Sequence, residues 1–295
     1  RELILRRPPA GHLPKSGHDM RREYTVQAKL AGAFPYVPRM VAFCDDHSVI
    51  GSDFYVMDKI RGTILRRELP AGFTLSKEDA RTLTTNWVER LVDLHGVDPA
   101  AAGLQELGRS DGYVARQVEG WSGRYSAAKT WNVPSFKRVM RWLEANQPDD
   151  VANCVIHNDW RLDNVVLDPD DPTKIIGALD WEMATLGDPL MDLGATLAYW
   201  IEADEGGLAK QFRLQPSYLP GMLTRDEIVQ LYSDKSGIAI EDFRFYRVYG
   251  YFRLAGIIQQ IYKRYHDGAT TDPRFKKFWL ASWYLHGQAR KAMRK

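Results

Sequence analysis

The chain has 295 residues, 44% of them hydrophobic, and a net charge of +2. It can therefore bury one large core or two unequal ones, and its charge gives no reason to expect nucleic acid or a membrane as a partner. No run of 18 apolar residues could span a bilayer. The N-terminus lacks the apolar segment of a secretory signal, and two cysteines provide no disulfide framework, so we expect a cytoplasmic protein.

The N-terminal part predicts a small β-rich region. Leu3–Arg6 is a short apolar run typical of a strand, and residues 18–31 place apolar side chains at helical spacing. Residues 37–43 and 54–60 are predicted to be two further strands, with a turn over residues 45–53 between them.

The C-terminal part is predicted to be mostly helical. Residues 76–94 begin with Ser-Lys-Glu-Asp, a typical helix N-terminus, and continue with apolar residues at helical spacing. Further helices are predicted over residues 113–126, 134–145, 224–234, 240–265 and 273–293. All nine tryptophans follow Gly62, and we expect most of them in the core, Trp87, Trp142 and Trp283 included.

Residues 201–223 form a long polar stretch between these helices. It contains three acidic residues, Glu202, Asp204 and Glu205, together with glycines and prolines. A loop of this length in a compact domain is usually functional or disordered. We expect it to act as a lid or specificity element over a substrate site.

Residues 155–193 carry the most informative pattern. Two runs rich in Val and Ile, residues 164–167 and 174–179, are joined by Asp-Pro-Asp-Asp-Pro and predict a β-hairpin-like pair. An Asp and an Asn precede the first run, and another Asp closes the second. Oxygen-bearing side chains are thereby brought to one end of a small sheet, which suits Mg²⁺.

The spacing within this stretch indicates a known family. His157, Asp159 and Asn164 form the frame H-x-D-x-x-x-x-N of a kinase catalytic loop, and a D-W-E tripeptide beginning at Asp180 stands where a kinase carries D-F-G. A G-D-P-x-x-D-L motif follows. The chain resembles the aminoglycoside phosphotransferase (APH)/choline kinase group of small-molecule kinases. Within that group it looks most like the kinase-like domains related to those fused to certain acyl-CoA dehydrogenases.

The resemblance implies roles for the residues of the motifs. Asp159 would accept or orient the proton of the attacking hydroxyl, and Asn164 and Asp180 would hold Mg²⁺. Arg161 is a candidate for contacting the γ-phosphate. Two residues would support the site structurally, His157 and Asp192. The alternative is that these acidic residues only form turns and helix caps, as Asp and Asn often do.

The resemblance also implies a cation on a strand of the small lobe that contacts the α- and β-phosphates and pairs with a helix glutamate. Arg6 is the candidate, with Arg7 as the near alternative, and either would replace the usual lysine. Glu23 would be the glutamate. Alternatively, Glu23 takes part in a solvent-exposed ion pair on its own helix.

The adenine ring would bind at the segment that links the lobes. Backbone groups of Asp58, Lys59 and Ile60 would hydrogen-bond the ring edge, although this segment could also be an ordinary edge strand. No G-x-G-x-x-G motif occurs, and no segment before Leu3 could supply the first strands and phosphate-covering loop of such a lobe. We therefore expect a truncated small lobe.

Together these features predict an α+β, two-lobed, protein-kinase-like fold, with a nucleotide-binding lobe over residues 1–61 and a helical lobe over residues 62–295. They predict transfer of the γ-phosphoryl group of ATP or GTP to a hydroxyl of a small molecule, with Mg²⁺. A hydroxy acid or acyl-CoA-type metabolite is favoured over an aminoglycoside, and choline would need an aromatic box that the sequence does not locate. The alternative is a catalytically inactive nucleotide-binding or scaffold protein.

Overall fold

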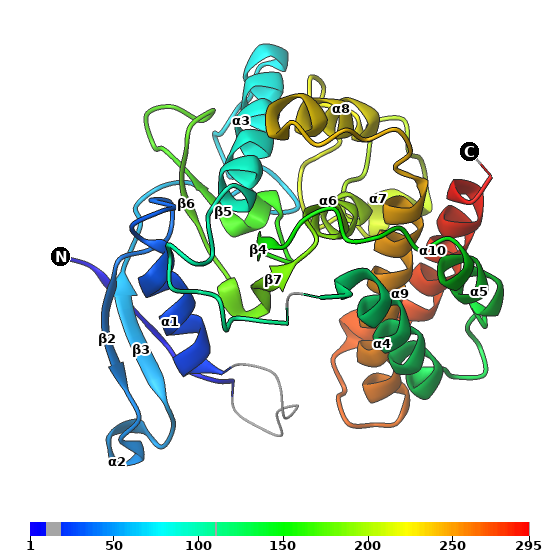
Figure 1. Ribbon diagram of the computed structural model, residues 1–295, viewed down its shortest axis with the longest axis horizontal. Helices are drawn as coiled ribbons and strands as arrows, with labels where there is room; N and C mark the ends of the chain where they lie inside the picture. Colours follow the sequence, from blue (N-terminus) through cyan, green and yellow to red (C-terminus); the bar gives the residue numbers. More distant parts are fainter. Residues whose placement is uncertain (10–18, 110, 295) are drawn as a thin grey trace. The chain divides into compact units, whose positions relative to one another are not determined.

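The computed structural model describes residues 1–9, 19–109 and 111–294 (Figure 1). The chain divides into two compact units. The first unit comprises Arg1–Arg109, Cys154–Leu186 and Leu219–Leu223, and the second comprises Ser110–Asn153, Gly187–Tyr218 and Thr224–Lys295. The lobe boundary predicted between residues 61 and 62 stays a prediction.

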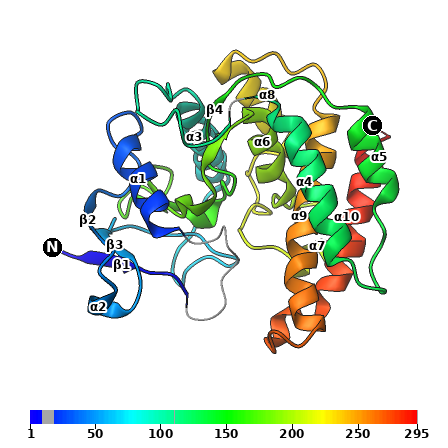
Figure 2. The ribbon, with the colours of Figure 1, turned by 60° about the horizontal axis from the view of Figure 1, so that its bottom comes forward.

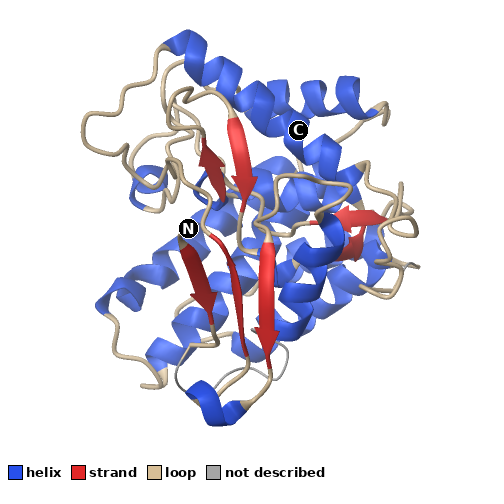
Figure 3. Cartoon of the chain, turned by 90° about the vertical axis from the view of Figure 1, so that its left-hand side faces the viewer, coloured by secondary structure: helices blue, strands red, loops and turns tan. Residues whose placement is uncertain are grey.

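The first unit begins with a three-stranded antiparallel sheet in the order β1-β3-β2 (Figure 3). The strands are β1 (Leu3–Arg6), β2 (Met40–Cys44) and β3 (Phe54–Asp58). Alternation along β3 turns Tyr55 and Met57 to one face, where they pack with Met20 of α1 (Met20–Leu30). Helix α1 therefore packs its apolar side on the sheet and leaves its polar side exposed.

Two of the predicted elements differ from the structure. The predicted strand over residues 37–43 begins later, at Met40, because Pro38 lacks the N–H group that a strand hydrogen bond needs. The predicted turn over residues 45–53 contains a short helix, α2 (His47–Ile50). Its N-cap, Asp46, accepts a hydrogen bond from the Ser48 amide at 2.9 Å.

The rest of the first unit supports a hairpin. Strands β5 (Val165–Leu167) and β6 (Ile175–Ala178) pair antiparallel, as predicted, and β4 (Cys154–Ile156) pairs with β7 (Thr185–Gly187). Helix α3 (Lys77–His95) starts with a capping box of Ser76 and Asp79. Its apolar face is buried, and Trp87 stacks on Trp160 of the loop after β4.

The linker that leads from β3 to α3 passes directly against this hairpin. Thr63 forms a bridge with Leu167 through hydrogen bonds of 2.8 and 2.9 Å. A Cβ on Gly62 would lie 2.1 Å from the carbonyl oxygen of Leu167, and one on Gly177 would lie 2.5 Å from the Ile60 side chain. Gly62 is therefore required by the close approach of the two backbones, whereas a side chain at Gly177 would have to displace the end of the Ile60 side chain.

The second unit is helical. Its helices are α4 (Tyr113–Ala128), α5 (Lys137–Ala145), α6 (Pro189–Ala198), α7 (Leu208–Gln211), α8 (Arg225–Ser236), α9 (Arg244–His266) and α10 (Phe278–Ala292), with 3-10 turn η3 (Pro273–Lys277) before the last. Helices α4, α6 and α10 pack against α9, and Figure 2 shows α4, α9 and α10 side by side. The crossing of α6 and α9 is so close that a Cβ on Gly250 would lie 2.0 Å from the Gly194 carbonyl oxygen.

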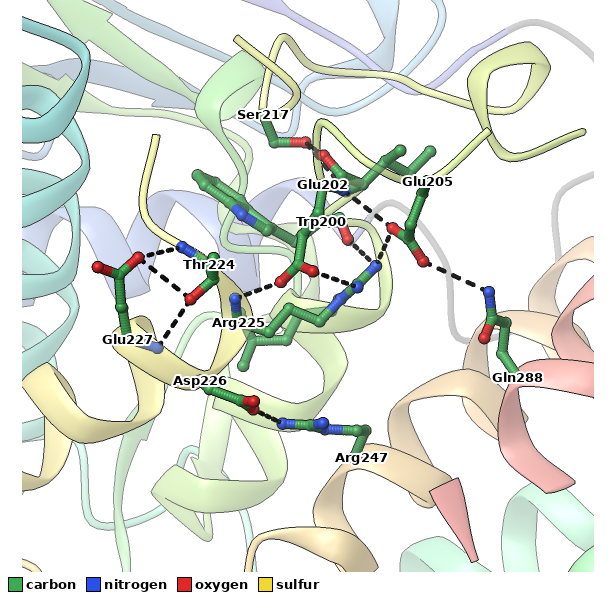
Figure 4. A network of polar contacts seen from close by, with 12 residues as sticks. Trp200, Glu202, Glu205, Ser217, Thr224, Arg225, Asp226, Glu227, Arg247 and Gln288 are labelled. Carbon is green, nitrogen blue, oxygen red and sulfur yellow. Dashed lines mark hydrogen bonds and ion pairs between the residues drawn. The ribbon is translucent and has the colours of Figure 1, made fainter. Parts of the chain in front are cut away.

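The start of the polar stretch 201–223 is held by a buried arginine (Figure 4). The Arg225 side chain is 9% exposed and contacts Glu205 at 2.7 Å and Glu202 at 3.6 Å. It also donates to the carbonyl oxygens of Leu197, at 3.3 Å, and of Trp200. Glu202 and Glu205 are therefore engaged within the second unit, and a role of this stretch as a lid stays a prediction.

The tryptophans are not all in the core. Trp87, Trp160, Trp181 and Trp200 are fully buried. The prediction for Trp283 was wrong, because its side chain is 49% exposed and its indole N–H donates to the Asn132 carbonyl oxygen at 3.0 Å. Among the described residues, no helix combines the length and the apolar character needed to cross a membrane.

Candidate active site

The loop after β4 makes a sharp turn at Asn158. Its backbone has a φ of 63°, in the left-handed region that glycine and, among the other residues, asparagine tolerate best. The Asn158 side chain donates to the carbonyl oxygen of Met183 at 3.1 Å. Asparagine is therefore suited to this turn, and its side chain also ties the loop to the segment that follows Asp180.

Three residues of the predicted catalytic loop are in direct contact. The amide nitrogen of the Asn164 side chain donates to the Asp159 carboxylate at 3.0 Å and to its backbone carbonyl at 2.9 Å. Arg161 contacts the same carboxylate at 3.1 Å. The Asp159 side chain is 19% exposed, so it stays accessible to a ligand although both its oxygens have partners within the loop.

Arg161 is fixed by a residue that the sequence reasoning missed. It makes two hydrogen bonds to the Asp163 carboxylate, at 2.8 and 3.1 Å. Burial raises the pKa of Asp163, and the Arg161 charge opposes that rise. Asp163 lies between Arg161 and Asn164 in the motif, where it looked like a variable position, so no sequence signal distinguished it.

His157 is fully buried beside the loop. Its Nε2 lies 3.0 Å from the Leu179 carbonyl oxygen, and its Nδ1 accepts the Asp159 amide at 3.3 Å. This pattern places the ring proton on Nε2. The ring packs against Trp160 and Trp181. Its predicted role in supporting the site stays a prediction.

The hairpin brings Asn164 and Asp180 to the same end. Val165 pairs with Ala178, and the Leu179 amide donates to the Asn164 carbonyl oxygen at 2.8 Å. Asp180 follows directly, with a φ of 67° and a side chain that is 34% exposed. The first of two 3-10 turns, η1 (Leu162–Asn164), ends at Asn164, and the second, η2 (Trp181–Met183), starts after Asp180.

This donor set fits Mg²⁺. The Asn164 side chain uses its nitrogen for Asp159, which leaves a carbonyl oxygen as a ligand beside the Asp180 carboxylate. In the part of the chain that the structure describes, no three His, Cys, Asp or Glu side chains form a metal cluster. A small set of hard oxygen ligands, completed by water and substrate phosphates, is the arrangement that Mg²⁺ prefers.

The predicted ion pair between the sheet and helix α1 is present. An Arg6 Nη lies 3.0 Å from Glu23 and 3.2 Å from Asp180. Glu23 is only 2% exposed, so the alternative of a solvent-exposed ion pair was wrong. Arg7, the other candidate for the cation, is exposed. Burial raises the pKa of Glu23, and the Arg6 charge opposes that rise.

Helix α1 makes a second contact that the sequence did not reveal. Arg22 donates to the Glu182 carbonyl oxygen at 3.2 Å and to that of Ala184. These carbonyls belong to η2 and the residue that ends it. Adjacent residues of α1 therefore reach Arg6 and the backbone that follows Asp180, so the helix links both parts of the site.

The predicted adenine-binding segment is only partly available. The Asp58 amide donates to the Arg39 carbonyl oxygen at 2.9 Å, and the Lys59 amide donates to that of Glu2 at 3.1 Å. The Asp58 carboxylate pairs with Arg1 and Arg39. A backbone contact with a nucleobase would therefore use Ile60, whose side chain packs on Gly177.

The G-D-P motif starts helix α6 in the second unit. Asp188 is its N-cap and is fully buried, and its carboxylate accepts the amides of Met191 at 2.9 Å and Val151 at 2.7 Å. Burial raises its pKa. Asp192, in the first turn, is also fully buried. Because it lies in the other unit, its predicted role in bracing the catalytic loop stays a prediction.

Comparison with known proteins identifies the family. The model of the phosphotransferase enzyme family (APH) matches residues 1–227. The chain belongs to this family. A protein of Ralstonia eutropha JMP134 that is assigned to the aminoglycoside phosphotransferases is 30% identical, with a TM-score of 0.81 over 93% of this chain and 83% of that one. The predicted membership is therefore confirmed, and this APH-family protein is classed among small-molecule kinases.

More distant structures share the fold alone. Macrolide 2'-phosphotransferase type I is 17% identical with a TM-score of 0.60, over 90% of this chain and 78% of that one. Choline kinase from Cryptosporidium parvum is 10% identical with a TM-score of 0.58, over 93% and 78%. Together with the mixture of helices and small antiparallel sheets, they confirm the predicted α+β, kinase-like fold class of this APH-family chain.

The APH-family chain also matches part of some longer proteins. Acyl-CoA dehydrogenase family member 10 of Mus musculus is 35% identical over 266 residues, which cover 90% of this chain and 24% of the relative. Acyl-CoA dehydrogenase family member 11 of Homo sapiens is 35% identical over 267 residues, covering 89% and 33%. The chain thus spans a third or less of the length of these relatives.

Proposed function

We propose that this protein transfers the γ-phosphoryl group of ATP or GTP to a hydroxyl group of a small metabolite. The observation that carries the proposal is the contact between Asp159 and Asn164 at the same end of the hairpin as Asp180. Phosphoryl transfer needs little covalent chemistry from the protein, and is accelerated mainly by positioning and charge stabilisation. A few fixed side chains therefore suffice.

Asp159 is the proposed general base. Its carboxylate would accept the proton of the acceptor hydroxyl as that oxygen attacks the γ-phosphorus and the bond to the leaving nucleoside diphosphate breaks. Asn164 and Arg161 hold this carboxylate from two sides. Arg161, itself fixed by Asp163, would place its positive charge near the γ-phosphate. Positive charge there stabilises the transferred group.

Asn164 and Asp180 are the proposed ligands of Mg²⁺, through the amide oxygen and the carboxylate. Bound Mg²⁺ neutralises charge on the phosphates during transfer. Arg6, oriented by Glu23, would contact the α- and β-phosphates, and Ile60 would contact the base. His157 and Asp192 would support the site structurally. ATP and GTP both fit this set, since only backbone groups meet the base.

The proposed acceptor is a hydroxy acid or an acyl-CoA-type metabolite. The support is that relatives sharing this region are named acyl-CoA dehydrogenase family members. An aminoglycoside is a polycation and would need free carboxylates. Glu202 and Glu205, two of the three acids considered for that purpose, are instead engaged by Arg225. Asp204 is the only exposed side chain of the three.

One observation favours a second candidate, a nucleotide-binding protein without catalytic activity. The Arg6 guanidinium contacts Asp180 as well as Glu23, so a ligand of the metal is already neutralised in part. An arginine also stands where the family usually has lysine. A protein of this kind would bind nucleotide without transferring its phosphoryl group.

The test is an acceptor screen. Purified protein is incubated with ATP or GTP and Mg²⁺, together with hydroxy acids, hydroxyacyl-CoA esters, choline or kanamycin. Release of ADP or GDP is measured, and products are analysed by mass spectrometry. A product heavier by one phosphoryl group with a hydroxy acid or hydroxyacyl-CoA supports the proposal. Nucleotide binding without turnover on any acceptor would favour the inactive candidate.

A further inference from the structure

The outward side of helix α10 forms an open groove in the second unit. Its lining residues recur at one-turn intervals on the helix and in the turn that follows it: Trp283, His286, Gly287, Arg290, Lys291 and Arg294. The opposite side of α10 is buried and includes Ala281, Leu285 and Ala289. The groove has a volume of about 480 Å³, within the usual size range of small-ligand sites.

Trp283 forms a fixed apolar wall at one end of this groove. Its side chain is 49% exposed, yet its indole N–H is bonded to the Asn132 carbonyl oxygen at 3.0 Å. Its ring also meets His286 edge-on, with centroids 6.0 Å apart. The orientation of the indole is therefore set before any ligand binds, which lowers the entropic cost of stacking a ring against it.

Gly287 leaves the floor of the groove open. A Cβ built on this residue would have no atom within 4 Å. Glycine in the middle of a helix costs about 1 kcal/mol relative to alanine, and no close approach of another element requires it at this position. The gap lies one turn after Trp283 and one turn before Arg290 and Lys291.

The other end of the groove carries uncompensated positive charge. Arg290 and Arg294 have no carboxylate partner among residues 1–9, 19–109 and 111–294, whereas Lys291 also borders a neighbouring cavity that is lined by acidic residues. By contrast, Arg225 and Arg247 elsewhere in the same unit are paired with acids. Two arginines about one helical turn apart suit a ligand with more than one negative charge, such as a diphosphate.

We propose that this groove binds an adenosine diphosphate group, with the purine over Gly287 against Trp283 and the phosphates on Arg290 and Arg294. Stacking on an aromatic side chain and phosphate contacts with arginine are the two interactions by which proteins commonly hold such a group. The group could come from a free nucleotide or from coenzyme A, which contains it. The site is separate from the residues proposed for phosphoryl transfer, all of which except Asp192 lie in the first unit.

The experiment measures ADP binding by calorimetry in the presence of EDTA. Gly287→Leu fills the groove without lowering helix propensity. Its matched control is Gly123→Leu, another exposed helical glycine with open space around its Cβ position. We expect Gly287→Leu to lose one binding event, or at least tenfold in affinity, while Gly123→Leu binds like wild type. Melting temperatures verify that both variants are folded.

Two further arms sharpen the result. Arg290→Ala with Arg294→Ala should weaken ADP at least tenfold and adenosine hardly at all, whereas Trp283→Ala should weaken both. CoA binding at least tenfold tighter than ADP would assign the group to coenzyme A, and equal binding would assign it to a free nucleotide.

Three outcomes would overturn the proposal. The first is ADP binding to Gly287→Leu that cannot be distinguished from wild type. The second is pyrophosphate binding as tightly as ADP, with no effect of Trp283→Ala, which would indicate a simple charged patch. The third is binding to vesicles of anionic lipid without any binding of ADP, which would make the same face a membrane-surface contact.

Discussion

Two regions of this protein are rich in carboxylates, yet they are organised in opposite ways. Around the hairpin, Asp159 and Asp180 are partnered by Arg161 and Arg6 but keep side-chain exposures of 19% and 34%. In the second unit, Glu202 and Glu205 surround Arg225, whose side chain is 9% exposed and which also binds backbone carbonyls. The Glu202 and Glu205 side chains are themselves 24% and 17% exposed, so the difference lies in their partners. Each acid of the first set has an arginine of its own, whereas both acids of the second share one buried arginine.

The difference shows that acidic composition alone does not mark a site. What distinguishes the hairpin region is that its carboxylates lie at the end of paired strands, where Asp159 also contacts the Asn164 side-chain amide. In the second unit, Glu202 and Glu205 hold the start of the polar stretch 201–223 against Arg225, the first residue of α8. Substitutions in the two regions should therefore have different effects on turnover and on stability.

Asp159→Asn should have the largest effect on turnover. The amide cannot accept the proton of the attacking hydroxyl, so the rate of phosphoryl transfer should fall by about 10²–10⁴-fold. The measurement is steady-state turnover of the acceptor found in the screen. Asp168→Asn, on the exposed turn of the same hairpin, is the control and should keep its rate. A tenfold or smaller loss in Asp159→Asn would remove this residue from the role of general base.

Arg225→Met should have the largest effect on stability. It removes the partner of two partly buried glutamates, and should lower the free energy of unfolding by about 3 kcal/mol. Arg247→Met is the matched control, because its partner Asp226 is 83% exposed; it should cost about 0.5 kcal/mol or less. Urea unfolding measures both. Equal effects would show that the network around Arg225 is no more than a surface cluster. Nucleotide binding should be unchanged in either variant.

Arg6→Met should also destabilise the protein, and the loss should depend on pH. The Arg6 side chain is about one-third exposed, so we expect a loss of about 2 kcal/mol at pH 7, less than for a fully buried pair. The reason is that Glu23, at 2% exposure, is left without its cation. Adding Glu23→Gln to Arg6→Met should recover part of the loss.

The pH dependence follows from the direction of the pKa shift. Burial raises the pKa of folded Glu23 above its ordinary value of 4.5, and removal of Arg6 raises it further. Stability associated with such a group is present below the unfolded pKa and is lost as pH rises through the folded pKa. The deficit of Arg6→Met should therefore be small below pH 4.5 and grow as the pH increases. A deficit that is constant with pH would contradict the ion-pair explanation.

The smallest expected effect is at Asn158. Its φ of 63° favours glycine over alanine, so Asn158→Ala should be about 1 kcal/mol less stable than Asn158→Gly. Chemical denaturation of the two variants measures the difference. If alanine is tolerated as well as glycine, then the loop does not hold this conformation in solution.

Much of the fold could be predicted from the sequence because local signals agreed with the structure. The Ser-Lys-Glu-Asp pattern at Ser76 predicted the start of α3, and the Asp-Pro-rich turn predicted the hairpin. The start of the strand predicted over residues 37–43 was wrong because Pro38 cannot donate a strand hydrogen bond. The burial predicted for Trp283 was wrong because an aromatic residue at helical spacing can face outward as well as inward. Spacing fixes a face of a helix, but not which face is covered.

The candidate site could be predicted only where the motif defines it. Arg6 and Glu23 were expected to form an ion pair although 17 positions separate them. They do so because β1 carries Arg6 and α1, which packs on the same sheet, carries Glu23. Asp163 and Arg22 could not be found, since their roles depend on contacts with Arg161 and with backbone carbonyls that no local pattern reveals. The occupied amides of Asp58 and Lys59 likewise follow from strand pairing.

The most direct test of the account is a thermal-shift titration with ATP, GTP and ADP, with and without Mg²⁺, on wild type and Asp180→Asn. A ligand at one hundred times its dissociation constant should stabilise the protein by about 2.7 kcal/mol. We predict a nucleotide-dependent increase in melting temperature that is larger with Mg²⁺ in wild type and loses its Mg²⁺ dependence in Asp180→Asn. A Mg²⁺ dependence that persists unchanged in Asp180→Asn, or no shift with any nucleotide, would contradict the proposed metal and nucleotide site.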